Sequence, residues 1–114
     1  MIKWTRTADL TYEAEWEGAT YLLLKEPGRA DDKGRPGRMA WFLHSYPVPG
    51  GVLEPALAYL GRRLDRAKVL TLFVLEGWTW YYGTVSAPGG EIWRHTTGTT
   101  RPLTDLLAGA HRTQ

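Results

Sequence analysis

Cysteine is absent from this chain of 114 residues. Without thiols the protein can have no disulfide framework, no thiolate metal site and no thiol nucleophile. Chains that lack disulfides are typical of reducing compartments, so we expect a cytoplasmic location.

Long apolar runs are missing as well, since no stretch approaches the length needed to span a bilayer. The amino-terminal segment 1–6 is too polar for the apolar core of a signal peptide. We therefore expect neither export nor a membrane partner.

Charge of one sign is in only slight excess, with a formal net charge of +2 and an isoelectric point near 9.0. This balance permits a nucleic-acid partner without requiring one. Asparagine is absent and arginine outnumbers lysine. A GC-rich genome and adaptation to heat both produce this bias, so its origin stays open.

The composition is that of an ordinary globular protein, with 43% hydrophobic and 23% charged residues. Its length suits one domain that buries a packed core without a covalent staple. We predict the α+β class, with mostly antiparallel sheet or sheets and two helices in a single compact domain over 1–114.

Strand patterns dominate the first part of the chain. Residues 11–17 alternate apolar side chains with three glutamates, which is the period of a half-buried strand. Glu17 and Gly18 then indicate a tight turn, and Pro27 ends the following leucine-rich run. The expected elements are strands over 11–17, 19–26 and 39–46, followed by a helix over 52–68.

That helix is predicted from leucines spaced four, three and four residues apart, which would share one face and pack on the sheet. These residues are Leu53, Leu57, Leu60 and Leu64.

The second part repeats the pattern of strands followed by a helix. Pro102 is expected in the first turn of a short terminal helix. The preceding strands are expected over 69–75, 78–86 and 91–97, with a hairpin at 88–90 between the last two. The predicted order is βββ(β)α and then βββα, which suggests two halves, 1–68 and 69–114.

Arginines gather on the face of the expected first helix that lies opposite the leucines. Arginine forks bind phosphate or carboxylate groups, so such a face could dock nucleic acid or an acidic protein surface. A solvated face near a helix C-terminus is the alternative. The residues are Tyr59, Arg62, Arg63 and Arg66.

Aromatic side chains occupy both faces of the strand expected at 78–86. Exposed aromatic residues could anchor a protein partner or stack on bases, because they offer large apolar areas at little cost in rotamer entropy. The alternative is that both faces of the strand are covered. The candidate binding residues here are Trp78, Trp80 and Tyr81.

A glycine-rich loop over 28–38 adds a basic patch that includes Arg35 and Arg38, in part offset by Asp31 and Asp32. The loop is expected at a hairpin tip and lacks the Gly-Lys-Ser/Thr ending of a phosphate-binding loop. It therefore predicts solvated basic charge and no phosphate cradle.

Groups suited to catalysis are few. The histidines His44, His95 and His111 occur singly, and none has metal-ligand spacing. The glutamates of strand 11–17 have no polar neighbours that would separate their pKa values, so they favour solubility or edge protection. We therefore expect no enzyme, no metal and no cofactor.

Together, the acidic strand and the arginine cluster favour docking on another macromolecule. We expect a small non-enzymatic binding or regulatory protein that docks on a larger protein assembly. Its size and composition are common among inhibitors and accessory factors carried by phages and plasmids. Nucleic-acid binding through the arginine-rich helix face is the alternative, and a small-molecule enzyme is the third interpretation. The sequence also leaves a homo-oligomer open.

Overall fold

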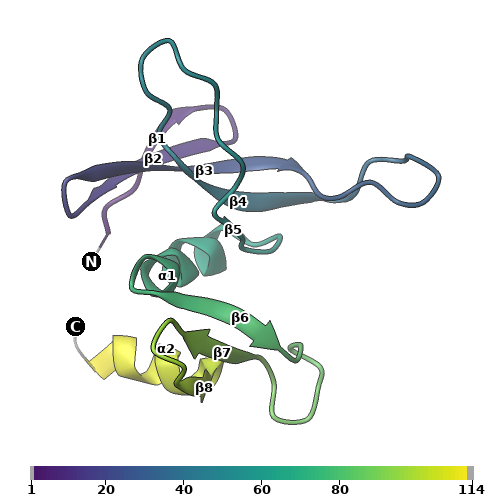
Figure 1. The fold of residues 1–114 in the computed structure, drawn as a ribbon, viewed down its shortest axis with the longest axis vertical. Helices are drawn as coiled ribbons and strands as arrows, with labels where there is room; N and C mark the ends of the chain where they lie inside the picture. Colours follow the sequence, from purple (N-terminus) through teal and green to yellow (C-terminus); the bar gives the residue numbers. More distant parts are fainter. Residues whose placement is uncertain (1, 113–114) are drawn as a thin grey trace. The chain divides into compact units, whose positions relative to one another are not determined.

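The computed structural model describes residues 2–112. Backbone contacts divide the chain into two compact units, Met1–Leu72 and Phe73–Gln114, and each is described here by itself. The predicted α+β class is confirmed, because residues 2–112 form two helices and two antiparallel sheets (Figure 1). The division into halves 1–68 and 69–114 stays a prediction. The single compact domain that they were predicted to form also stays a prediction.

The first unit contains a five-stranded antiparallel sheet in which each strand pairs with the next along the chain. The predicted strands at 11–17, 19–26 and 39–46 are confirmed, and two short strands that the sequence did not indicate flank them. The five are β1 (Thr5–Ala8), β2 (Thr11–Trp16), β3 (Ala19–Pro27), β4 (Met39–Ser45) and β5 (Ala58–Tyr59).

The turn between β2 and β3 is confirmed at Glu17 and Gly18. Trp16 pairs with Ala19, so only two residues form the turn, and both have positive φ, 48° and 81°. This conformation matches the twist of an antiparallel hairpin. It fixes the register that places the apolar residues of β2 on one face.

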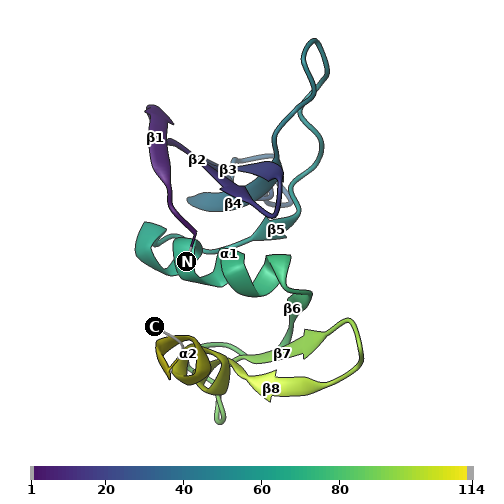
Figure 2. The same cartoon turned by 90° about the vertical axis from the view of Figure 1, so that its left-hand side faces the viewer.

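Buried side chains lie on both faces of this sheet, and its two fully buried leucines share one face. Strand pairing aligns Tyr12, Leu23, Leu43 and Ala58 across four strands, and both leucines are fully buried. The Lys68 ammonium lies 4.5 Å from the centroid of the Tyr12 ring, which places the first helix on this face (Figure 2). The opposite face of the sheet is turned away from that helix.

The first helix, α1, spans Leu64–Leu75, so the helix predicted over 52–68 is wrong. The segment before it forms β5 instead. Trp41 forms backbone hydrogen bonds with two residues after β5: Leu60 N donates to Trp41 O at 2.9 Å, and Trp41 N donates to Gly61 O at 2.7 Å. Gly61 has a φ of 86°, which a continuing helix cannot accommodate.

The strand predicted over 69–75 is also wrong, because these residues lie in α1. The buried residues Leu70 and Thr71 follow the buried Ala67 by three and four residues, which is the spacing of one helix face. The Thr71 hydroxyl donates to Ala67 O at 2.8 Å, so this buried polar group is satisfied within the helix.

The second unit contains a three-stranded antiparallel sheet in the order β6-β7-β8 and the helix α2. The strands predicted over 78–86 and 91–97 are confirmed but shorter, and the terminal helix is confirmed. Pro102 was predicted in the first turn of that helix and instead ends β8, a strand that was not predicted, directly before the helix begins. The elements are β6 (Trp78–Tyr82), β7 (Ile92–His95), β8 (Thr100–Pro102) and α2 (Leu103–Arg112). Residues 2–112 form two helices, α1 and α2, and neither is long and apolar enough to cross a membrane.

Candidate functional site

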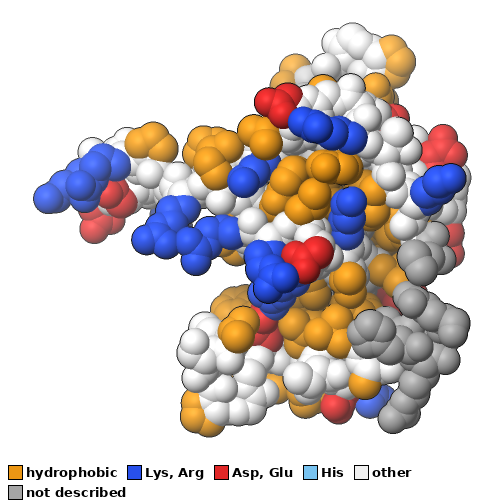
Figure 3. Space-filling view, turned by 180° about the vertical axis from the view of Figure 1, so that it is seen from behind, with side chains coloured by type: hydrophobic (Ala, Val, Ile, Leu, Met, Phe, Trp, Pro, Cys, Tyr) orange, Lys and Arg blue, Asp and Glu red, His pale blue; other side chains and the backbone are white. Residues whose placement is uncertain are grey.

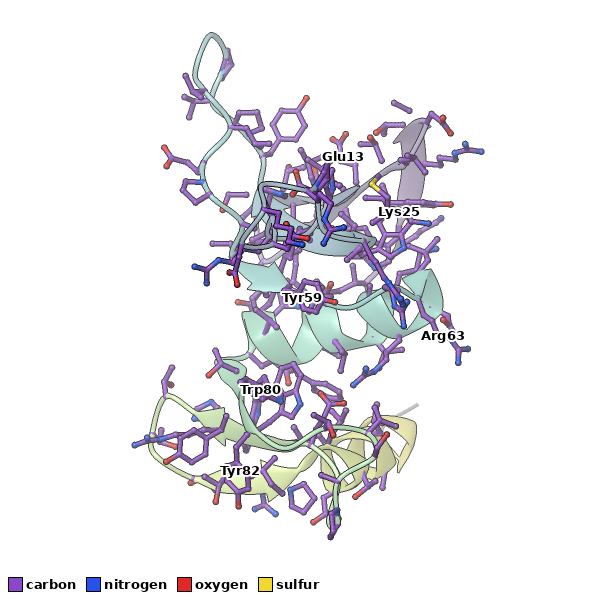
Figure 4. The ribbon with its side chains drawn as sticks, turned by 90° about the vertical axis from the view of Figure 1, so that its right-hand side faces the viewer. Glu13, Lys25, Tyr59, Arg63, Trp80 and Tyr82 are labelled. Carbon is purple, nitrogen blue, oxygen red and sulfur yellow. The ribbon has the colours of Figure 1, made fainter. Side chains whose placement is uncertain are left out.

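The aromatic strand β6 carries the most distinctive surface of the second unit. Trp80, Tyr81 and Tyr82 are 54%, 48% and 56% exposed, whereas Trp78 is half-buried. Trp80 pairs with the buried Trp93, and Thr79 pairs with Arg94, so successive side chains lie on opposite faces. Figure 4 shows Trp80 and Tyr82 on this strand.

A bulge brings the two tyrosines together. The pairing passes from Trp80 to Tyr82 with a register shift, which leaves Tyr81 without an opposite residue in β7. The rings of Tyr81 and Tyr82 meet edge to face at 5.2 Å between centroids. Bulges bend a strand locally and redirect its side chains, so the register shift accounts for this paired arrangement.

Basic charge accompanies these rings. The Arg94 guanidinium lies 5.4 Å from the centroid of the Tyr81 ring, within the range of a cation–π contact. The charged side chains of β6, β7 and β8 other than histidine are Arg94 and Arg101. We define the aromatic edge as Trp80, Tyr81, Tyr82 and Arg94.

The strand β6 lies at the border of its sheet because it is the first strand in the order β6-β7-β8, so one side of it pairs with no other strand of residues 2–112. The Trp80 indole nitrogen donates to Gly83 O at 2.9 Å, which fixes the ring against the end of its own strand. Side chains held in this way lose little conformational freedom when a partner covers them. The Trp80 ring is therefore held in place by its own strand.

The arginine cluster predicted on one helix face does not exist, because its members lie on different elements. Tyr59 is in β5, Arg62 and Arg63 precede α1, and Arg66 is in α1; Figure 4 shows Tyr59 and Arg63 on separate elements. Tyr59 packs against Phe42 at 5.4 Å between centroids. The error follows directly from the wrong helix boundaries.

Arg63 is paired with an acidic neighbour. Its guanidinium contacts both carboxylate oxygens of Asp65, at 3.2 and 2.8 Å. The hydrogen bonds from Arg63, followed by the backbone N–H of Arg66, hold the pKa of Asp65 below its usual value. Both side chains are largely exposed, so the pair contributes little to stability. Asp65 therefore offsets the positive charge of Arg63, a residue that was predicted as a possible phosphate contact.

The basic loop at 28–38 is an ordered hairpin tip on the first unit, and Figure 3 shows its lysine, arginine and aspartate side chains on a protruding segment. Asp31 accepts backbone N–H groups from Lys33 and Arg35, both at 2.9 Å, and pairs with the Arg35 guanidinium at 2.8 Å. The Arg35 backbone N–H is the largest cause of the lowered pKa of Asp31. Arg38 is exposed at the base of the loop. Arg35 is thus committed to the loop itself.

The groups considered for catalysis form no reactive cluster. Among residues 2–112 no three side chains of the metal-ligating types come together. Both ring nitrogens of His95 are in hydrogen-bond contact, with Thr97 Oγ1 and Glu76 O at 2.9 Å each. Glu13 and Glu15 lie in β2, but β2 ends at Trp16 and Glu17 lies in the turn, so the three glutamates do not share one strand. The side chain of His111 lies outside the described ones.

Two features were not predicted from the sequence. The contact of Arg94 with Tyr81 depends on the register of β6 and β7, which the hairpin loop alone does not specify. The second feature is a pair formed by the buried His44 and Glu26 from neighbouring strands. Their separation of eighteen residues along the chain leaves no local sequence signal.

No protein-family model, curated protein or solved structure significantly matches this chain.

Proposed function

We propose that this chain is a small non-enzymatic binding protein that docks on a larger protein through the aromatic edge. The observation that supports the proposal is the exposure of about half of each of Trp80, Tyr81 and Tyr82 on a strand at the border of its sheet. Aromatic residues of this size ordinarily account for much of a protein core. Their exposure therefore favours a surface that a partner covers.

The residue types agree with a protein interface. Tryptophan, tyrosine and arginine are the residues most enriched among those that contribute most binding energy in such interfaces. Arg94 beside Tyr81 adds a cation that an acidic group on the partner could approach. The partner surface would therefore combine apolar contact area with carboxylates near its rim.

Site-specific photo-crosslinking in the cells that express this chain tests the proposal. A benzophenone amino acid at position 82 should yield one discrete protein adduct, identified by mass spectrometry. The matched control is position 85, because Val85 lies in the loop after β6 and is 77% exposed. Equal adduct patterns from positions 82 and 85, or none from position 82, would contradict the proposal.

Single-stranded nucleic acid is the second candidate partner. It is favoured by the stacking surface of Tyr81 and Tyr82 beside Arg94, because bases stack on aromatic side chains and arginine binds phosphate. Protein docking remains preferred since the arginine-rich helix face on which the nucleic-acid interpretation depended is not formed, because only Arg66 of its predicted members lies in α1.

Salt dependence distinguishes the two candidates. We expect only weak retention of single-stranded oligonucleotides at low salt, lost by about 150 mM because few phosphates would be neutralised. Fluorescence anisotropy with a labelled oligonucleotide measures this binding. Tight binding that survives about 150 mM salt and is abolished by Arg94→Ala would instead establish the nucleic-acid function.

A further inference from the structure

A buried histidine in the first unit connects its sheet to the long loop between β4 and β5. His44 on β4 is 4% exposed. Its Nε2 lies 2.6 Å from Glu26 Oε1 on β3, and its Nδ1 lies 3.2 Å from the backbone carbonyl of Glu54 in the loop. Both ring nitrogens therefore face oxygen atoms.

We propose that His44 and Glu26 form a pH-dependent clasp that holds the loop 46–57 against the sheet and releases it as the pH rises. Because each ring nitrogen faces an oxygen atom, each of the two contacts is a hydrogen bond only if a proton lies between its nitrogen and its oxygen. A charged imidazolium beside a carboxylate supplies both protons, and so does a neutral imidazole beside a protonated carboxyl group. When the pair loses one proton, the remaining proton is held on Nε2 by the shorter, charge-assisted contact with the Glu26 carboxylate, and the lone pair of Nδ1 then faces that of Glu54 O.

Titratable groups other than Glu26 also share this face of the sheet with His44. Strand pairing places Leu22 directly beside His44 and Glu13 directly beside Leu22, so Glu13 of β2 shares this face of the sheet. Glu26 of β3 contacts the ring, Glu54 belongs to the loop, and Tyr59 of β5 lies on the same face.

The loop has few other anchors between its ends. Tyr46 N donates to Thr20 O at 3.0 Å and Leu57 N donates to Leu43 O at 2.7 Å, so backbone hydrogen bonds hold both termini of the loop. In between, the contact of His44 with Glu54 connects the loop to the sheet. Losing one of these few attachments should let the middle of the loop open locally.

Opening would change an apolar surface. Val48 and Val52 in this loop are 73% and 86% exposed, and Leu53 and Leu57 are also exposed. Opening the loop would therefore move apolar side chains that are already exposed. This inference does not depend on the aromatic edge, which belongs to the second unit.

Amide hydrogen exchange of the whole protein tests the clasp. After correction for the chemical exchange rate, protection of the amides in 50–57 should fall by about tenfold or more between pH 5.5 and pH 8, a range that spans imidazole titration. Glu26→Gln should remove most of this pH dependence while the protein stays folded, because the Glu26 side chain is 37% exposed. Nitrogen-15 shifts of the His44 ring should show two N–H groups at the lower pH.

His95→Gln is the matched control, since His95 also contacts two oxygen atoms but lies in the second unit. It should keep the full pH dependence of the loop. Protection that is unchanged between the two pH values in the unmodified protein, or a full pH dependence retained in Glu26→Gln, would overturn the proposal.

Discussion

Burial of single residues in this protein depends on strand pairing, as the leucines between 53 and 64 show. Leu60 is 1% exposed, whereas Leu57, three residues earlier, is 50% exposed. Leu60 follows β5 and its backbone N–H donates to Trp41 O, which brings its side chain into the core. Leu57 and Leu60 therefore have the spacing of a helix face, yet one side chain is exposed and the other is buried.

We predict that Leu60→Ala lowers the free energy of unfolding by about 2–5 kcal/mol, because the change empties a buried leucine site. Leu57→Ala is the matched control and should cost less than about 1 kcal/mol, since that side chain is half exposed. Urea unfolding of both variants provides the measurement. Similar losses from the two substitutions would mean that both leucines are core residues, as the helical prediction required.

The strands were predictable as elements because their signals are local. Residues 13–16 alternate between more and less buried positions, and the turn at Glu17 and Gly18 has positive φ at both residues, which glycine adopts without strain. The helices were harder to place. The apolar run at 69–75 fits a buried strand or a buried helix equally well, and periodicity alone does not distinguish them over such a length.

The hairpin that supports the aromatic edge depends on one crowded glycine. A Cβ atom at Gly83 would lie 2.2 Å from Gly90 O, and the residue has a φ of 87°. Gly89 in the same hairpin has a φ of 82° but open space around it. The two glycines thus share the backbone conformation and differ in steric surroundings.

We expect Gly89→Ala to cost about 1–2 kcal/mol, which is the strain of a left-handed conformation. Gly83→Ala should cost clearly more, because the clash with Gly90 adds to that strain. Thermal unfolding, followed by the near-ultraviolet signal of the β6 aromatic residues, measures both variants. If the two substitutions were equally costly, close packing at Gly83 would not stabilise this hairpin.

Across the whole molecule, the candidate contact surface could be located from the sequence only in part. The aromatic strand was recognisable because five consecutive residues, Trp78–Tyr82, combine aromatic and β-branched side chains. The contact of Tyr81 with Arg94 and the exposure of the tyrosines could not be recognised from the sequence. Both depend on the bulge and on the strand order. The arginine cluster was wrong because a shared helix face requires one continuous helix.

The affinity for the protein captured at position 82 tests most directly whether the aromatic edge binds a protein partner. Interfaces concentrate their binding energy in a few aromatic and arginine residues, so Tyr82→Ala should weaken binding by about tenfold or more. Val85→Ala is the control, since Val85 is also exposed and apolar but lies outside the aromatic edge. Isothermal titration calorimetry at about 150 mM salt should therefore show a raised Kd for Tyr82→Ala and an unchanged Kd for Val85→Ala. Equal Kd values for Tyr82→Ala and the unmodified protein would contradict the account.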